Sequence, residues 1–488
     1  MTANYLAFDL GAESGRAILG RLQSGVLSVE EVHRFPNQPL RENGSLRWNV
    51  NQLWAEMQRA LAGPLPELAG AGVDAWGCDY ALLGAGGKLV ENPYHYRDGR
   101  TQGVMEEICA KIGRDHIYSV TGIQFLTFNS LFQLYAAARQ SPDSIAKAHA
   151  LVTIPDLLNY WLTGRLCCEY TNASTTQMVD ARTRSWATGL LQELDLPARL
   201  LQELVEPGAT IGKLANGTPV IAPACHDTGS AVAAIPLSES TAYLSSGTWS
   251  LLGAEVSQPV ITPKARDLNF TNEGGVCNTV RLLKNIGGLW LLQSCRNRWK
   301  AEGHEFSYDD LLAEANDERL AFRTFFDPDY RGFFGPENMV AAIGEYCTGS
   351  EQAPPANAPA MTRAILENLA FKYRMTLESL EEITGRRFSE IRIVGGGSRN
   401  RLLNQFTANA TGRTVIAGPV EATALGNIVM QMLATGAVSS LAEGRAVIDR
   451  SFPAQRFEPT DPDRWDAQYA RFGHYMEFSN IARVTSAN

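Results

Sequence analysis

The 488-residue sequence lacks the features that would place it in a membrane or on nucleic acid. It opens without a basic leader and apolar signal core, and no uncharged run approaches the length needed to cross a bilayer. A net charge of -9 disfavours nucleic acid and anionic membrane surfaces as bulk partners. We therefore expect a cytoplasmic protein without nucleic-acid or membrane partners, whose oligomeric state the sequence does not reveal.

Several short motifs are also missing. The eight cysteines are scattered, and none are paired at the Cys-x-x-Cys spacing of zinc and redox sites. Neither a Walker sequence nor a Gly-x-Gly-x-x-Gly fingerprint is present, which disfavours a P-loop or a dinucleotide site. The cysteines are expected to be thiols in a reducing compartment.

What is present predicts an α/β protein with two domains. A chain of this length exceeds one ordinary core, and 45% hydrophobic with 19% charged residues suits a globular enzyme. Residues 5–19 and 241–252 each read as strand, small-residue turn and strand, and alternating strands and helices follow, except for a mostly helical stretch at 102–194. We predict domains at 1–236 and 237–488 with mixed sheets flanked by helices, and the stretch 219–236 could hold a hinge.

The first candidate site is the turn between Asp9 and Arg16. A strand that ends at Asp9 and turns through Gly11 and Gly15 could aim backbone N–H groups at a phosphate. Asp9 could meanwhile hold a hydrated magnesium ion. An ordinary hairpin explains the same residues, and taken alone it is the better explanation.

Two further turns carry small residues. Residues 244–250 (Leu-Ser-Ser-Gly-Thr-Trp-Ser) form a second hairpin with hydroxyl groups available to phosphate oxygens, although a plain sheet turn would look the same. Gly395, Gly396 and Gly397 follow a predicted strand and precede a helix, which permits close backbone approach to a ligand. Three consecutive glycines favour a ligand over packing alone.

His226, Asp227 and Thr228 lie where an apolar strand gives way to a helix of small residues. Asp227 could accept the proton of a hydroxyl that attacks the γ-phosphate of ATP. Asp227 or Thr228 could equally cap the helix, and the residues alone do not decide.

A polar loop at residues 96–101, preceded by Trp76-Gly77-Cys78-Asp79, offers the hydrogen-bonding and aromatic groups that a sugar needs, or else a surface ion pair. In the stretch 284–293, the Trp and Leu residues are expected in a helix core, with Asn285 near the start of that helix.

Taken in order, these motifs resemble those of the FGGY family of carbohydrate kinases. The order is Asp-x-Gly-x-x-Ser-Gly-Arg, Tyr-Arg-Asp-x-Arg-Thr, His-Asp-Thr, Ser-Ser-Gly-Thr-Trp-Ser and Val-Gly-Gly-Gly, and it runs from Asp9 to about Gln431. The resemblance implies two actin-like (ribonuclease H-like) domains, with ATP and a sugar in a cleft that closes on binding.

The resemblance also implies roles for individual residues. Asp227 would be the general base, with Asp9 near a magnesium ion that bridges the ATP phosphates. The implied ATP-binding residues are Ala12, Glu13, Ser14, Gly15, Arg16, Thr248, Asn285, Gln293 and Gly396. The implied substrate-binding residues are Gly77, Asp79, Arg97, His226, Asp227 and Thr228. Since a carboxylate facing ATP would be unfavourable, we expect the Glu13 side chain to point away from the phosphates.

Four stretches indicate the branch of the family that acts on L-rhamnulose, giving the ketose 1-phosphate. They are residues 121–126, 171–177, 272–275 and 417–422. Ser-Leu-Phe-Gln at 130–133, where many members have Lys-Leu-x-Trp, fits this branch. Trp76 and Phe125 could line an apolar wall for the methyl group of this sugar, but core packing is the stronger interpretation. L-Fuculose, ribulose and xylulose remain alternatives, because a methyl or hydroxyl group is discriminated only modestly by an apolar pocket.

Two other classes of protein would share parts of this pattern. A non-catalytic actin-like sensor would retain the phosphate turns but lose the base, whereas Asp227 is present. An actin-like chaperone ATPase would need no sugar site and would hydrolyse ATP without one. The expected mechanism is direct in-line transfer, because the sequence offers one candidate base and no evident covalent carrier.

Overall fold

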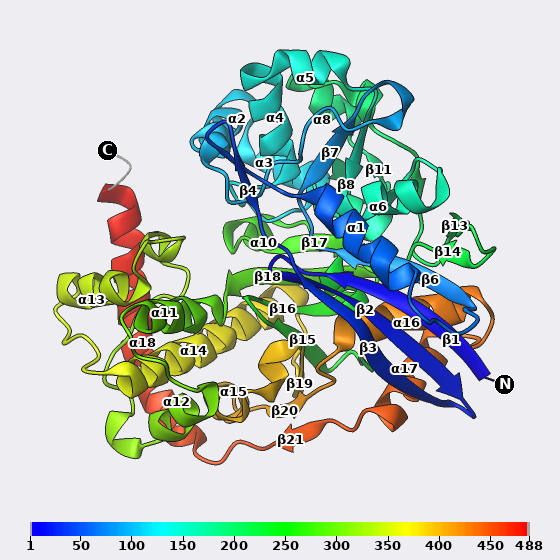
Figure 1. Cartoon of the computed structure of the whole chain (residues 1–488). Coiled ribbons are helices and arrows are strands. Elements are labelled where there is room, and N and C mark those ends of the chain that lie inside the picture. Colours follow the sequence, from blue (N-terminus) through cyan, green and yellow to red (C-terminus); the bar gives the residue numbers. More distant parts are fainter. Residues whose placement is uncertain (1, 486–488) are drawn as a thin grey trace. The chain divides into compact units, whose positions relative to one another are not determined.

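The computed structural model describes residues 2–485, and the side chains of residues 477–485 are outside that description. The backbone groups into two compact units (Figure 1). The first comprises Met1–Pro236, Glu255–Leu283 and Glu421–Pro453, and the second comprises Leu237–Ala254, Lys284–Val420 and Ala454–Asn488. One division follows Pro236, but each unit is assembled from three separate segments.

The first unit contains a six-stranded mixed sheet in the order β13-β14-β6-β1-β2-β3. Its strands are β1 (Thr2–Leu10), β2 (Ser14–Gln23), β3 (Val26–Pro36), β6 (Gly70–Ala75), β13 (Thr210–Lys213) and β14 (Pro219–Ile221). β1 pairs antiparallel with β2 and parallel with β6, whose other neighbour is β14. The predicted strand-turn-strand at residues 5–19 is confirmed.

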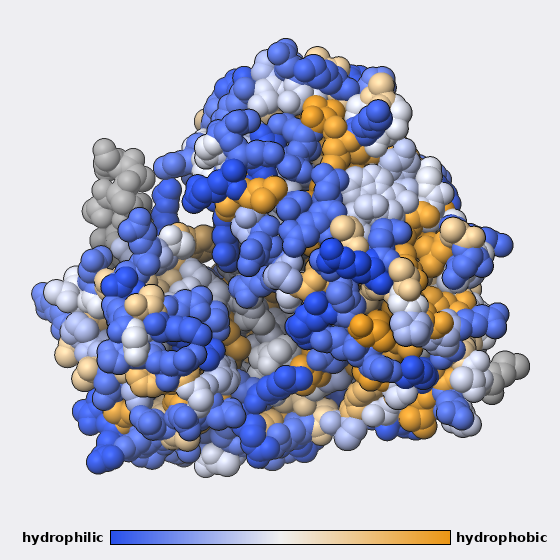
Figure 2. Space-filling view, in the orientation of Figure 1, coloured by the Kyte–Doolittle hydropathy of each residue, from blue (hydrophilic) through white to orange (hydrophobic). Residues whose placement is uncertain are grey.

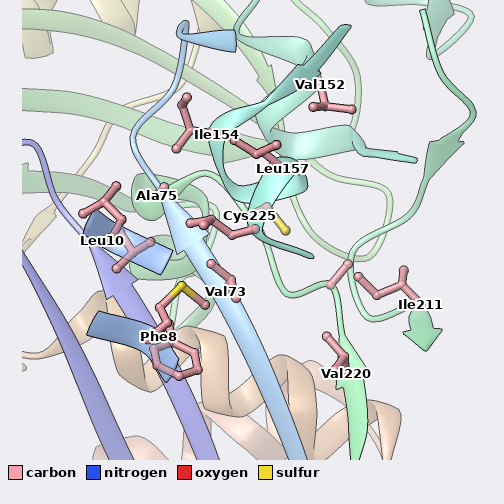
Figure 3. Packing of buried hydrophobic residues seen from close by; sticks show 14 of the residues in the cluster. Phe8, Leu10, Val73, Ala75, Val152, Ile154, Leu157, Ile211, Val220 and Cys225 are labelled. Atoms are coloured by element: carbon pink, nitrogen blue, oxygen red, sulfur yellow. The ribbon is translucent and has the colours of Figure 1, made fainter. Parts of the chain in front are cut away.

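Alternation along β1 explains why both faces of this sheet are covered. Leu6, Phe8 and Leu10 belong to one apolar core with residues of α1 (Val50–Leu61) and α6 (Ile154–Thr163). Figure 3 shows Phe8 and Leu10 close to Val73 and Ala75 of β6, within this core. The intervening residues face α16 (Ala422–Ala434), as the hydrogen bond between the hydroxyls of Tyr5 and Thr435, just past its end, indicates.

The stretch 102–194 is mostly helical, as predicted. Its helices are α2 (Val104–Ile112), α3 (Arg114–Thr121), α4 (Ser130–Gln140), α5 (Pro142–Lys147), α6, α7 (Tyr170–Ser174) and α8 (Thr188–Glu193). Four two-stranded ribbons accompany the first unit: β4 (Leu40–Glu42) with β5 (Ser45–Arg47), β7 (Tyr80–Leu83) with β8 (Ala150–Thr153), β9 (Cys168–Glu169) with β12 (Leu204–Val205), and β10 (Val179–Asp180) with β11 (Ser185–Trp186). The remaining helices of this unit are α9 (Asp227–Ala233), α10 (Pro263–Asp267), α16 and α17 (Leu441–Ser451).

The second sheet has seven strands in the order β17-β18-β16-β15-β19-β20-β21. These are β15 (Thr241–Ser246), β16 (Trp249–Val256), β17 (Thr271–Gly274), β18 (Val280–Gly287), β19 (Glu390–Val394), β20 (Thr414–Ala417) and β21 (Gln455–Phe457). The helices of the second unit are α11 (Trp290–Ala301), α12 (Tyr308–Ala315), α13 (Met339–Gly349), α14 (Ala358–Thr384), α15 (Arg401–Thr411) and α18 (Pro462–Thr485). The succession β19–α15–β20–α16 agrees with the predicted alternation of strands and helices.

The two sheets share one strand plan. In the first, β1 lies between its antiparallel hairpin partner β2 and the parallel strand β6, followed by parallel β14 and antiparallel β13. In the second, β15 lies between antiparallel β16 and parallel β19, followed by parallel β20 and antiparallel β21. The duplicated architecture suggested by the two glycine hairpins is therefore a repeat of topology.

The stretch 219–236, which could hold a hinge, contains β14 and α9 and belongs to the first unit, and a hinge there stays a prediction. No helix within residues 2–485 is long and apolar enough to span a bilayer. All eight cysteines are free thiols. On the face seen in Figure 2, hydrophilic residues predominate and hydrophobic ones form separate patches.

Candidate functional site

The β1–β2 hairpin presents its turn in a fixed conformation. The backbone N–H of Gly11 donates to the carbonyl of Ser14 at 2.9 Å. Asn37, just past β3, donates from its side-chain amide to the Gly11 carbonyl at 2.9 Å and from its backbone to the Glu13 carbonyl at 3.0 Å. The Glu13 side chain is exposed, and its orientation relative to a nucleotide stays a prediction.

Arg16 holds two carboxylates at the end of this hairpin. Its guanidinium is paired with Asp9, its cross-strand neighbour, and with Glu421. Burial raises the pKa of Asp9; Arg16 opposes this rise, while the negative charges of Asp227 and Glu421 add to it. Burial and the neighbouring Asp9 also raise the pKa of Asp74 well above its usual range.

Asp74 is fully buried and only partly satisfied. Its Oδ2 accepts a hydrogen bond of 2.6 Å from Asn427, and its Oδ1 has no partner within the described residues. Asp9, Asp74 and Asp227 thus form an acidic patch, in which Arg16 stabilises the charges of Asp9 and Asp74. No group of three or more His, Cys, Asp or Glu residues in the described part of the chain is arranged to hold a bare metal ion.

Asp227 is the first residue of α9. Its Oδ1 accepts hydrogen bonds from the Thr228 backbone N–H at 2.6 Å and from the Thr228 hydroxyl at 3.2 Å. Its side chain is 30% exposed, and Oδ2 has no hydrogen-bond partner among the side chains that are described. One oxygen therefore accepts from Thr228 in the first turn of α9 and the other is available for chemistry, so a structural role at the start of the helix and a general-base role are compatible.

His226 lies beside Asp227 and is nearly buried. Its Nε2 is 3.4 Å from Asp227 Oδ1, and its Nδ1 is 3.1 Å from Arg281 Nη2 and 3.3 Å from Glu273 Oε2. Arg281 is completely buried and also contacts Glu273 at 3.1 Å. The pKa of the Glu273 carboxyl lies below its ordinary value although burial raises it, because the Arg281 guanidinium stabilises the carboxylate.

Gly77 lies directly against His226. A Cβ atom at Gly77 would be 3.1 Å from His226 Nε2 and 2.9 Å from Thr175 Oγ1, so only glycine fits. The next residue, Cys78, has a φ of 71°, which is strained for a side chain larger than Gly. Thr175 receives the Cys78 N–H at 3.1 Å and thereby fixes this bend beside the candidate base.

Asp79 is completely buried, and its oxygens are engaged by four donors. Oδ2 accepts from the indoles of Trp48 at 2.6 Å and Trp76 at 3.0 Å, and from the Tyr96 N–H at 3.2 Å. Oδ1 accepts from Gln133 at 2.8 Å. Burial raises the Asp79 pKa to about 6, against the effect of these hydrogen bonds. Asp79 therefore joins three segments of the first unit.

The polar loop around Arg97 is hydrogen-bonded to Gln133, the residue that also donates to Asp79. Arg100 donates to the Gln133 carbonyl and side-chain oxygen, each at 2.9 Å, and stacks on Tyr94. The Arg97 side chain is exposed, and its backbone N–H donates to His95 Nδ1 at 2.9 Å. Trp76 and Phe125 are 6% and 5% exposed, which agrees with core packing.

Two of the four stretches that suggested a branch of the family contact this region. In 171–177, Asn172 donates to the carbonyls of Trp76 at 3.2 Å and Cys225 at 3.3 Å, which links the segments before Gly77 and His226. In 272–275, Glu273 contacts His226, and the Gly274 N–H donates to Ser174 at 2.7 Å. Residues of both stretches thus hold the backbone around Gly77 and His226.

In the second unit, the Thr248 turn is packed against the start of α11. The Leu289 N–H donates to the Gly247 carbonyl at 3.0 Å, and the Trp290 N–H donates to the Thr248 carbonyl at 3.2 Å. Thr248 itself is half-buried at the tip of the β15–β16 hairpin.

The triple-glycine turn contacts the same hairpin. Gly395 has a φ of 81°, and a Cβ there would be 2.9 Å from the Ser246 carbonyl oxygen. A Cβ at Gly397 would be 2.0 Å from Ser246 Oγ, whereas Gly396 is exposed with no atom within 4 Å of a Cβ. Gly395 and Gly397 permit the close approach, and Gly396 faces open space.

Asn285 lies near the end of strand β18, so its prediction at a helix start is wrong. α11 begins later, at Trp290, and carries Gln293 on its exposed face. Gln293 accepts from Arg296 at 3.3 Å and donates to Asn297 at 3.1 Å. The Gly287-Gly288 pair separates β18 from α11. A Cβ at Gly288 would be 2.5 Å from the Thr248 carbonyl oxygen, so this position requires glycine.

Sequence reasoning missed Arg281 and the role of Glu273. Arg281 belongs to no motif, and the only signal was a lone arginine in an apolar strand. Glu169 was also missed: it accepts hydrogen bonds from Thr171 at 2.8 Å and from the Cys225 N–H at 2.9 Å, fixing the backbone before His226.

The fold belongs to a known class of two-domain kinases. It matches a gluconate kinase from Lactobacillus acidophilus with a TM-score of 0.80 over 99% of this chain and 98% of that one, at 17% identity, a level that shows the fold alone. The family model "FGGY family of carbohydrate kinases, N-terminal domain" matches residues 4–224, and the corresponding C-terminal model matches residues 242–435. The chain belongs to the FGGY family of carbohydrate kinases, and its actin-like α/β fold is the predicted one.

Two relatives are similar along almost the whole chain. A rhamnulokinase from Bacteroides thetaiotaomicron is 44% identical over 485 residues, covering 97% of this chain and 99% of the relative. A rhamnulokinase from Oceanobacillus iheyensis is 40% identical over 458 residues, covering 92% and 96% respectively.

Proposed function

We propose that this protein phosphorylates L-rhamnulose with ATP, giving L-rhamnulose 1-phosphate and ADP. Full-length similarity of 40–44% to proteins named rhamnulokinase supports this choice within the family. The observation that carries the proposal is Asp227, which has an accessible carboxylate oxygen beside His226 and Gly77.

Each domain has its own part in this proposal. The N-terminal domain, residues 1–236, would bind the ketose and supply the base, and the C-terminal domain, residues 237–488, would bind the nucleotide. The segments 255–283 and 421–453 group with the first unit and contribute Glu273, Arg281 and Glu421 to it. Small molecules are the only partners that the proposal requires.

Asp227 would deprotonate the attacking hydroxyl through Oδ2, while Oδ1 stays bonded to Thr228. The hydroxyl oxygen forms a bond to the γ-phosphorus as the bond from that phosphorus to the ADP oxygen breaks. His226, Thr228, Gly77 and Arg97 would contact the sugar. Asp79 has no exposed surface, so we assign it an indirect role in holding Trp76 and the polar loop.

Ala12 to Arg16 would bind phosphate through backbone N–H groups and the Arg16 charge. In the second unit, Thr248, Asn285, Gln293 and Gly396 would bind ATP, with Gly396 against the adenosine. The oxygen donors of the acidic patch suit a hard cation, so Asp9 would hold Mg²⁺ through water. The ion would neutralise developing charge on the phosphates.

The test is ADP release from the purified protein with ATP and Mg²⁺, comparing no sugar with L-rhamnulose, L-fuculose, ribulose, xylulose and glycerol. We expect the highest kcat/KM with L-rhamnulose over a low background. A higher kcat/KM with another ketose would make that ketose the assigned substrate. Equal ATP turnover without any sugar would refute the kinase proposal and favour an ATPase.

A further inference from the structure

The pair Glu273–Arg281 forms a charged cluster beneath the proposed sugar site. β17 and β18 are neighbouring strands (Figure 1), and Glu273 on β17 is directly opposite Arg281 on β18 in the antiparallel register. Both side chains are at least nine-tenths buried, and both reach Nδ1 of His226. A buried ion pair of this kind adds little net stability, so its position calls for another explanation.

The chemistry of Arg281 fixes the proton on His226. A guanidinium is always charged and can only donate hydrogen bonds. Since Arg281 Nη2 is 3.1 Å from Nδ1, that nitrogen must accept, and the ring proton must lie on Nε2. Nε2 is the atom that lies 3.4 Å from Asp227 Oδ1 and closest to Gly77.

Without Arg281, the neighbouring carboxylate would reverse this arrangement. Glu273 Oε2 is 3.3 Å from Nδ1 and can only accept when ionised, so alone it would attract the proton to Nδ1. Arg281 Nη1 forms an ion pair with Glu273 Oε2 at 3.1 Å, and Arg281 Nε donates a hydrogen bond to the Gly274 carbonyl at 2.8 Å. Arg281 thereby neutralises the competing acceptor and donates to the ring in a single fixed pose.

We propose that Arg281 and Glu273 are positioning residues that hold His226 as the neutral Nε2–H tautomer, with Nε2 on the side of Asp227 and Gly77. The positive end of this N–H dipole, 3.4 Å from Asp227 Oδ1, adds to the effect of the Thr228 donors that hold Oδ1, and Oδ2 is left to receive the proton of the sugar hydroxyl. The kinetic consequence rests on the proposed kinase function, whereas the tautomer itself does not.

The first arm of the test is long-range ¹H–¹⁵N NMR of the unliganded protein labelled at its seven histidines, with His226 assigned from the His226→Asn spectrum. We expect the Nε2–H pattern for His226 at pH 7.5, and the same pattern in Glu273→Gln, which keeps the Arg281 donor. A Nδ1–H tautomer or an imidazolium in the native protein would overturn the proposal, whichever substrate the enzyme uses.

The second arm replaces both charges together, as Arg281→Met with Glu273→Met, so that neither is left buried alone. We expect a folded protein whose KM for ATP changes less than about twofold, whose His226 loses the single tautomer, and whose kcat falls about 10- to 100-fold. The fall in kcat should be smaller in Glu273→Gln. Unchanged kcat and KM in the folded double variant would overturn the proposal. If no ketose supports turnover in the native enzyme, the proposed function fails and the spectra still decide the tautomer.

Discussion

Arg16 is the cross-strand partner of Asp9 and forms an ion pair with it at the turn end of the β1–β2 hairpin. The Asp9 side chain is 9% exposed and that of Arg16 is 18% exposed, so the pair is largely withdrawn from water. Burial raises the pKa of Asp9, and the main opposing influence is Arg16. The charged state of Asp9, which we propose to be near the magnesium ion, therefore depends on one guanidinium.

Replacing Arg16 by Gln should destabilise the protein by about 3 kcal/mol at pH 8, because it leaves buried negative charge without a partner. A raised native pKa means that ionised Asp9 opposes folding above that pKa, and that protonation relieves the penalty as the pH falls through it. The deficit of Arg16→Gln should therefore shrink between pH 8 and pH 5. Urea unfolding of both proteins across this range measures it.

The double variant Arg16→Gln with Asp9→Asn is the matched control, because it removes the unpaired charge and should recover part of the lost stability. Arg21→Gln breaks an exposed pair between β2 and β3, with Glu30, and should cost less than about 1 kcal/mol. If Arg16→Gln were as stable as the native protein at pH 8, Asp9 would not depend on Arg16.

The hairpins were predictable because their signals are local. Asp9, Gly11 and Gly15 specify a strand and turn within a few residues, and the apolar alternation around them specifies the sheet. Asn285 was misplaced because Gly287 and Gly288 end a strand as readily as they precede a helix. Only the contact of Gly288 with the Thr248 carbonyl decides, and that contact joins distant segments.

The support of the candidate base was not predictable from the sequence. Glu273 and Arg281 meet through the register of β17 and β18, and both reach His226 only after that ribbon packs on α7 and the segment before α9. Asp79 shows the same limitation. A carboxylate in a polar motif suggests a ligand contact, and only the fold reveals that four internal donors surround it.

Asp79 should make the stability of the protein pH-dependent. Its native pKa of about 6 lies above the unfolded value, so its ionisation opposes folding at high pH and its protonation favours folding as the pH falls through 6. Relative to Asp79→Asn, the native protein should gain about 1 kcal/mol between pH 7.5 and pH 5. Urea unfolding of the pair across this range gives the difference directly.

The same comparison with Asp143→Asn, an exposed residue in the first turn of α5, provides the reference. Its difference from the native protein should change much less over this range. A flat difference for Asp79→Asn would show that the Asp79 pKa is ordinary despite its burial.

The triple-glycine turn allows a matched pair of substitutions. Gly396→Ala adds a methyl group in open space and should leave the Tm unchanged. If Gly396 lies against the adenosine, this methyl group should raise the KM for ATP about tenfold, equivalent to about 1.4 kcal/mol. Differential scanning fluorimetry and initial rates at varied ATP separate the two effects.

Gly397→Ala places its Cβ 2.0 Å from Ser246 Oγ and should destabilise the second unit by about 1–3 kcal/mol through overpacking. The two alanine variants should thus divide, one losing nucleotide affinity and the other losing stability. A Gly396→Ala enzyme with native KM for ATP would remove this residue from the proposed nucleotide site.

The most direct prediction concerns Asp227. In Asp227→Asn the amide can still accept the Thr228 N–H through its oxygen, so this contact at the start of α9 should remain and the protein should stay folded. It can no longer take up a proton, and kcat with L-rhamnulose should fall about 100- to 10,000-fold while the KM for ATP stays within about twofold. Asp143→Asn makes the same chemical change at an exposed position and should leave both constants unchanged. Steady-state ADP release with varied ATP and varied sugar measures all of these constants. Near-native turnover in Asp227→Asn would exclude this carboxylate as the base and leave it a structural role at the start of α9.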